Sequence, residues 1–169
     1  MSFGGLLAAY GAIRIGSVDW PNAPEILGVN LPGFMTFLLI CSSLTMVKAI
    51  TAVKQGDMMR FRRHILLNAG GGFIFLGLQV YEWTHLINQG LLVWSNPWGS
   101  SLFGATFFAI TGFHGMHVTG GVIYLICVYF EGKSGRYDGG RFERVEVAGL
   151  YWHFVDLVWI LVFTFIYLL

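Results

Sequence analysis

The sequence has few charged residues. Only 11% of its 169 residues are Asp, Glu, Lys or Arg, and the net charge is +1. A soluble domain carries about 25% charged residues, so this chain cannot cover a water-facing surface with charge. The near-neutral balance also excludes the basic field that a nucleic-acid partner requires. Since 56% of the residues are hydrophobic, the composition indicates a protein of the lipid bilayer.

Cysteine is scarce as well. Cys41 and Cys127 are the only two cysteines in the chain, and both lie in apolar runs without a Cys-x-x-Cys spacing. Such a pair provides neither a disulfide framework nor a zinc site. We expect both to be packing residues, because a free cysteine behaves as a small hydrophobic side chain.

Long apolar runs are abundant in the sequence. A helix needs about 20 residues to cross a hydrocarbon core of roughly 30 Å. Four runs reach that length without the alternation of barrel strands, and they cover 31–53, 65–87, 102–130 and 147–169. We therefore expect an all-α, polytopic transmembrane helix bundle in which these spans run alternately up and down. The span 102–130 is the longest.

A shorter apolar segment opens the chain. It offers about 15 residues before Ser17 and Asp19, which as a helix would measure about 22 Å and fall short of a full crossing. Small residues recur at every fourth position, a pattern typical of tightly packed membrane helices. This small-residue line consists of Gly4, Ala8, Ala12 and Gly16. We expect about five helices in one transmembrane domain, 1–169, with the first helix short and its small-residue line in contact with another chain or ordered lipid.

Basic residues gather in two of the breaks between spans. Nine of the ten Lys and Arg are Lys48, Lys54, Arg60, Arg62, Arg63, Lys133, Arg136, Arg141 and Arg144. Two spans separate the two breaks, so both breaks lie on one face, which the positive-inside rule places in the cytoplasm. We expect a multi-pass membrane protein with its C-terminus outside. Arg141 and Arg144 stand beside a span, where they are suited to contact phospholipid.

Ionisable residues inside the spans form short stripes. Such residues are rare, because a charge near the bilayer centre costs about 2.5–3.5 kcal/mol. The stripes are Gln79, Glu82 and His85; His114 and His117; and His153 and Asp156. We expect the stripes to face the bundle interior. The predicted structural polar network consists of Glu82, His114, His117, His153 and Asp156.

The depth of each residue predicts its partner. At 1.5 Å per residue, Asp156 and His117 differ by roughly 6 Å in depth, whereas Glu82 and His114 differ by roughly 12 Å. We expect Asp156 to pair with His117 first and His114 second, directly or through one water molecule. Glu82 should instead find a hydroxyl, a backbone group or water.

The histidines also permit a metal or haem site. Haem would need two axial ligands on facing helices, such as His114 and His153. A di-metal centre commonly takes Glu-x-x-His from two helices, and this chain has one copy, Glu82-x-x-His85. A cofactor-binding bundle is therefore the weaker alternative. The glycines at 70–72 lie inside an apolar span, which favours close helix packing over a phosphate-binding loop.

Several stretches resemble subunit III of the haem–copper cytochrome c oxidases in its short bacterial form. GATFFAITGFHGMHVTGGVIYL (104–125) and VEVAGLYWHFVDLVWILVFTFIYLL (145–169) resemble the sixth and seventh helices of that family. LGLQVYEWTHL (76–86) resembles the fifth helix, and SSLTMVKAITAVKQGDMMRFRR (42–63) the fourth. GGLLAAYGAIRIGSVDWP (4–21) resembles the end of the third. The first two helices of the family have no counterpart here.

The resemblance implies an accessory membrane subunit of a respiratory oxidase in the bacterial inner membrane. It would pack on subunit I, with subunit II and other respiratory subunits as further partners. It would hold lipid, stabilise the catalytic subunit and support its proton uptake, while the complex reduces oxygen and translocates protons. It implies no cofactor in this chain: haem and copper belong to partner subunits, and His114 and His117 are structural. Subunit III-like chains of quinol oxidases and nitric oxide reductases are the alternatives.

Overall fold

The computed structural model describes residues 2–137 and 139–169, and the described chain is almost entirely helical. The helices are α1 (Ser2–Gly16), α2 (Ala23–Leu27), α3 (Asn30–Lys54), α4 (Met58–Asn88), α5 (Ser101–Lys133) and α6 (Glu143–Val162), with a π-helical continuation, η1 (Phe163–Leu168). Four of these segments are long and apolar enough to cross a membrane: α3, α4, α5, and α6 together with η1. The four predicted spans are confirmed, and α5 is the longest helix, with 33 residues.

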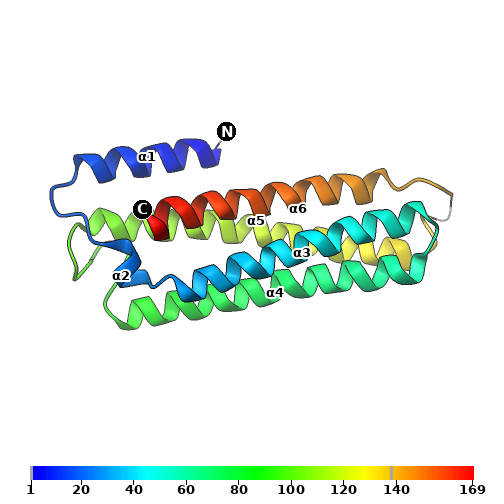
Figure 1. Cartoon of the computed structure of the whole chain (residues 1–169), viewed down its shortest axis with the longest axis horizontal. Coiled ribbons are helices and arrows are strands. Elements are labelled where there is room, and N and C mark those ends of the chain that lie inside the picture. The colour runs from blue at the N-terminus through cyan, green and yellow to red at the C-terminus, as the bar shows by residue number, and fades with distance from the viewer. Residues whose placement is uncertain (1, 138) are drawn as a thin grey trace.

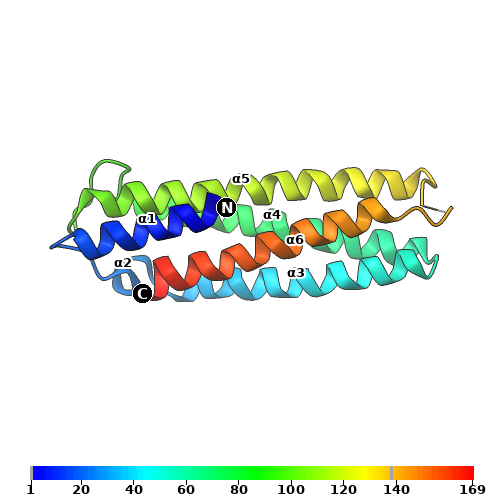
Figure 2. The same cartoon turned by 90° about the horizontal axis from the view of Figure 1, so that it is seen from above.

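The four long helices form a bundle in which chain neighbours are antiparallel (Figure 1). Helix α3 packs against α4 and α6, and α5 packs against the same two helices. Helix α1 lies beside the first half of α5 in both views (Figures 1 and 2). The Arg14 side chain ties the end of α1 to the carbonyl oxygen of Leu169. The alternating up-and-down order predicted for the spans is confirmed.

Short connections explain the antiparallel order of α3 and α4. Gly56 has φ +75°, a conformation that glycine adopts without steric cost and that commonly ends a helix. Asp57 then begins α4 by accepting a hydrogen bond from the Arg60 backbone N–H at 3.0 Å. With so few residues between helix end and helix start, the chain must turn back on itself.

Two elements differ from the predicted five helices. Helix α2 is a single short turn of five residues, too short to show an apolar periodicity, and Pro24 lies in its first turn, where proline is tolerated. The last span does not remain α-helical but ends in η1, which packs against α2 and α3. The expected bundle of about five helices with a short first helix is confirmed, and α2 is an additional short turn at one end of that bundle.

The glycines of 70–72 have different surroundings. A Cβ added at Gly72 would lie 2.5 Å from Val122 Cγ2 and 2.7 Å from Trp152 Cη2, and one at Gly71 would lie 3.2 Å from Ser42 Cβ. Close packing against α3, α5 and α6 is thus confirmed at both positions. At Gly70 nothing lies within 4 Å.

Other small side chains lie on the surface of the bundle and do not pack in its interior. The line Gly4, Ala8, Ala12 and Gly16 is exposed along α1, so its expected contact with another chain or lipid stays a prediction. Cys41 and Cys127 are both exposed. Both lie on helix faces that point away from the bundle, so the packing role expected of them stays a prediction.

Candidate functional site: the polar interior of the bundle and the grooves at its edge

The seam between α3 and α6 is closed by side-chain hydrogen bonds. Trp152 Nε1 donates to Ser42 Oγ at 2.9 Å, Trp159 Nε1 donates to Thr36 Oγ1 at 3.0 Å, and His153 Nδ1 lies 2.5 Å from Ser43 Oγ. Both indole rings are fully buried. The helices are antiparallel, so Trp152 and His153 pair with Ser42 and Ser43, whereas Trp159, further along α6, pairs with the earlier residue Thr36. Together the bonds fix one register. The sequence had marked His153 but missed the serine and threonine partners, which occur in an unremarkable apolar run.

Glu82 forms a hydrogen bond with Tyr167 at the end of the bundle where η1 lies. The Tyr167 hydroxyl donates to Glu82 Oε2 at 2.9 Å, and both residues are buried. The expectation that Glu82 finds a hydroxyl is confirmed. Tyr167 belongs to η1, so the π-helical turn is the element that brings this hydroxyl to α4.

The direct pair between Asp156 and a histidine is not formed. Within the described residues neither carboxylate oxygen of Asp156 has a hydrogen-bond partner. His117 turns back on its own helix, with Nδ1 2.8 Å from the Phe113 carbonyl oxygen. His114 is fully buried among the rings of Phe75, Trp159 and Phe3, whose centroids lie 5.6, 5.0 and 6.2 Å away. A bridge through one water molecule stays a prediction.

His85 does not share the inward face of Gln79 and Glu82. Gln79 and Glu82 are buried, whereas His85 is exposed and its Nε2 lies 3.0 Å from Gln89 Nε2. Each three-residue step falls about 60° short of a full helical turn, so His85 lies about 120° around α4 from Gln79. The predicted inward stripe is correct for its first two members only.

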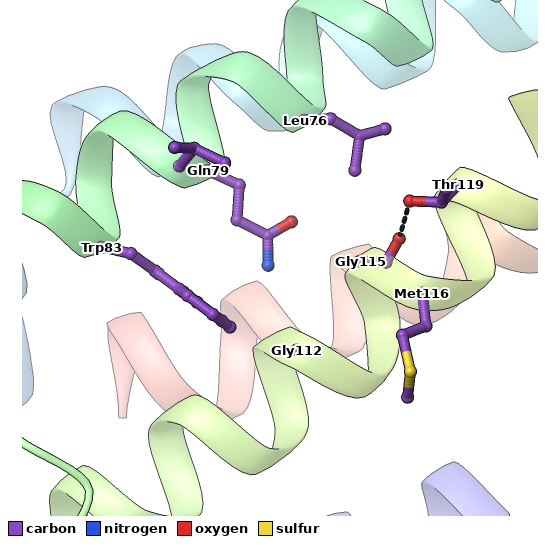
Figure 3. A pocket seen from close by; sticks show the side chains of 8 residues that line it. Leu76, Gln79, Trp83, Gly112, Gly115, Met116 and Thr119 are labelled. Atoms are coloured by element: carbon purple, nitrogen blue, oxygen red, sulfur yellow. Dashed lines mark hydrogen bonds between the residues drawn. The ribbon is translucent and has the colours of Figure 1, made fainter.

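A groove opens between α4 and α5 (Figure 3). Its volume is about 440 Å³, and it is lined by Leu76, Gln79, Val80, Trp83, Gly112, Gly115, Met116 and Thr119. Gln79 Nε2 donates to the Thr111 carbonyl oxygen at 2.6 Å, while Gln79 Oε1 has no partner among the described residues. A Cβ at Gly115 would lie 3.1 Å from that oxygen. Glycine therefore lets the α5 backbone approach the amide, and the surface that the groove exposes is mostly apolar.

The basic end of the bundle is organised around Glu131. Its carboxylate accepts hydrogen bonds from Arg144 at 2.5 Å, from Arg136 at 3.3 Å and from the Tyr137 hydroxyl at 2.7 Å. Burial, and then the hydrogen bond to Glu131, raise the pKa of Tyr137. Arg141 and Arg144 line one pocket of about 210 Å³ together with Arg136 and Tyr137. The two arginines singled out in the sequence thus lie at the same small basic pocket.

A metal site requires several His, Cys, Asp or Glu side chains to lie close together. Within 2–137 and 139–169, no three His, Cys, Asp or Glu side chains come together as a metal-binding group. The single Glu-x-x-His copy does not gather its members inside the bundle, because Glu82 is buried and His85 is exposed. Aromatic rings occupy the space around His114 that a haem would need.

Comparison with known proteins identifies the family. Residues 12–169 match the family model for cytochrome c oxidase subunit III. This chain belongs to that family. Cytochrome c oxidase subunit 3 of Synechocystis sp. is 39% identical over 170 residues, which cover 99% of this chain and 69% of that protein. The Thermostichus vulcanus subunit 3 is 35% identical, with 100% and 81% covered, and a probable subunit 3 of Nocardia farcinica is 34% identical, with 99% and 80% covered.

Membership confirms several expectations from the sequence. The resemblance to subunit III and the all-α transmembrane bundle are both confirmed. Subunit III is a cofactor-free accessory subunit of an oxidase complex. The chain is therefore a multi-pass membrane protein that works with other oxidase subunits.

Proposed function

We propose that this chain is a non-catalytic subunit that packs laterally on subunit I of a cytochrome c oxidase and stabilises it during turnover. The packing around His114 carries the proposal. Rings from α1, α4 and α6 enclose the imidazole, so the most buried histidine of the bundle serves the packing of its own helices. Haem and copper then belong to subunits I and II, and the support of proton uptake is indirect.

Lipid is the second partner in this proposal. The pocket of Arg136, Arg141 and Arg144 lies directly beside the ends of α5 and α6, where arginines attract anionic headgroups. Glu131 already binds two of these arginines, so Arg141 is the side chain best placed to take a phosphate. Replacing Arg141 and Arg144 with Gln should reduce the anionic lipid that copurifies with the complex. Unchanged bound lipid, measured by mass spectrometry, would count against this role.

The arrangement of the connections supports the proposed orientation. The α3–α4 and α5–α6 connections lie at one end of the bundle, and α2, the α4–α5 connection and the C-terminus lie at the other (Figure 1). Nine of the ten Lys and Arg therefore share one end, which the positive-inside rule assigns to the cytoplasm. A cysteine introduced at Ser134 should react with a membrane-impermeant reagent only from the cytoplasmic side, and one at Ser95 only from outside.

Removal of the chain tests the proposed function. An oxidase that lacks this chain should keep its haem and copper and its initial rate of oxygen reduction, but lose activity after fewer turnovers than the complete complex. Loss of haem or copper as soon as the chain is removed would contradict an accessory role. An unchanged lifetime during turnover would contradict the stabilising role.

A further inference from the structure

The outward face of α4 has a regular relief of large and small side chains. One ridge consists of Leu66, Phe73, Val80 and Ile87, and a second of Leu67, Ile74 and Tyr81. These seven side chains are between 44% and 64% exposed. Gly70, Gly77 and Thr84 lie between the ridges, again seven residues apart. Added Cβ atoms at Gly70 and Gly77 would meet nothing within 4 Å, so the floor between the ridges is open.

A seven-residue repeat is the spacing of helix-to-helix packing. Two helices that cross at about 20° meet every seven residues, with large side chains of one in the holes of the other. Small residues on such a face let two membrane helices approach closely. Lipid chains impose no such period, so the repeat on α4 matches a transmembrane helix.

A pocket beside the Tyr81 end of this face contains an acidic side chain that a partner helix could bind. It has a volume of about 260 Å³, and Tyr81, Glu82, His85 and Asn30 are among its lining residues. Glu82 is only 3% exposed. Its Oε2 accepts the Tyr167 hydroxyl, whereas its Oε1 is a buried atom with no hydrogen-bond partner among the described residues. A carboxylate in this position calls for a cation or a strong hydrogen-bond donor from outside the chain.

We propose that the outward face of α4 is the docking surface for a transmembrane helix of a partner oxidase subunit, and that this helix inserts a Lys or Arg side chain into the Glu82 pocket. This inference rests on the proposed function and names the surface that serves it. The ridges and floor hold the partner helix along α4, and the Glu82 carboxylate fixes its register. The Tyr81 ring, on the rim of the pocket, flanks the path of the basic side chain.

Photo-cross-linking in the intact complex identifies what covers this face. Tyr81 and Ile74 are each replaced by the photoreactive amino acid p-benzoylphenylalanine, with the exposed Leu150 on α6 as the control position. The two α4 positions should give adducts with one and the same helix of another subunit. The Tyr81 adduct should lie within one turn of a Lys or Arg, and Leu150 should not reach that helix. Lipid adducts at both α4 positions, or a helix without a basic residue there, would overturn the inference.

A charge variant tests the pocket separately. Glu82→Gln keeps an oxygen that can accept the Tyr167 hydroxyl but removes the charge, so the chain should fold normally. We expect it to dissociate from the complex at least about tenfold faster in a salt and detergent wash, because it leaves a partner cation unpaired. Glu143→Gln, at the opposite end of the bundle, should dissociate at the wild-type rate. Equal dissociation of wild type and Glu82→Gln would overturn the role of the pocket.

The subunit composition of each sample separates the two proposals. A chain that copurifies with oxidase subunits but gives only lipid adducts from α4 leaves the proposed function intact and refutes this surface. A chain that copurifies with no oxidase subunit refutes the proposed function itself.

Discussion

Two of the seams between neighbouring long helices, α3–α6 and α4–α5, use polar residues in opposite ways. The α3–α6 seam pairs side chains of one helix with side chains of the other in three hydrogen bonds. The α4–α5 seam has one such contact, from Gln79 to a backbone carbonyl, and opens into a groove beside it. The first seam fixes the register of the fold. The second leaves an open apolar groove and one buried amide oxygen without a hydrogen-bond partner among the described residues.

The junction where both seams meet should be the most sensitive point. Gly72→Val should destabilise the chain by about 1–3 kcal/mol, because the added Cβ overlaps Val122 and the Trp152 ring. Gly70→Val adds the same atoms two residues earlier, where nothing lies within 4 Å. The measurement is thermal unfolding of the purified chain in detergent. Equal unfolding temperatures for the two variants would contradict the close approach at Gly72.

The closed seam should depend on its indole donors. Trp152→Phe keeps an aromatic ring but removes the Nε1–H that Ser42 accepts, and we expect a loss of about 1 kcal/mol. A double-mutant cycle with Ser42→Ala isolates the hydrogen bond, and its coupling energy should be about 0.6 kcal/mol. Zero coupling would show that the register is set by shape alone.

The open seam should tolerate a change that the closed seam does not. Gln79→Leu removes a bond to Thr111 but also removes the Oε1 atom that has no partner within the described chain. These two effects oppose each other, so the unfolding temperature of the isolated chain should change less than in Trp152→Phe. A larger loss than in Trp152→Phe would reverse the comparison between the seams.

The smallest effect is expected at the basic end, outside both seams. Burial and the hydrogen bond to Glu131 raise the pKa of Tyr137. The protonated form therefore stabilises the fold fully below the unfolded pKa of about 10, and this contribution is lost as the pH rises beyond it. Tyr137→Phe should remove that alkaline dependence and cost less than about 1 kcal/mol near neutral pH. An unchanged alkaline profile of unfolding would show that the bond does not stabilise the connection.

The sequence predicted the parts of the fold that depend on long patterns. Span length and apolar composition placed α3 to α6. The depth of Glu82 predicted a hydroxyl, a backbone group or water as its partner, and the structure shows the Tyr167 hydroxyl. The depth count did not give the direct bond expected for Asp156, because it gives height along a helix but not rotation around it. His117 has a suitable height, yet its ring is turned toward Phe113.

The short elements α2 and η1 could not be predicted from the sequence for a different reason. Helix α2 and the π-helical turn of η1 are only five and six residues long, so no periodicity identifies them. They pack together at one end of the bundle, where η1 meets α2 and α3. The hydroxyl partners Thr36 and Ser42 were missed because hydroxyl groups in apolar spans usually bond to their own helix. Here both hydroxyls also bond to their own helix backbone, while their oxygens accept the indole N–H groups.

Purification through an affinity tag on this chain tests the central claim most directly. Mass spectrometry of the purified complex should find subunit I and a copper-binding subunit II, and the complex should show haem absorption. The chain, once separated from the complex in mild detergent, should show no haem absorption. A haem spectrum that stays with the separated chain, or a preparation without subunits I and II, would contradict the claim that this is an accessory subunit of a cytochrome c oxidase.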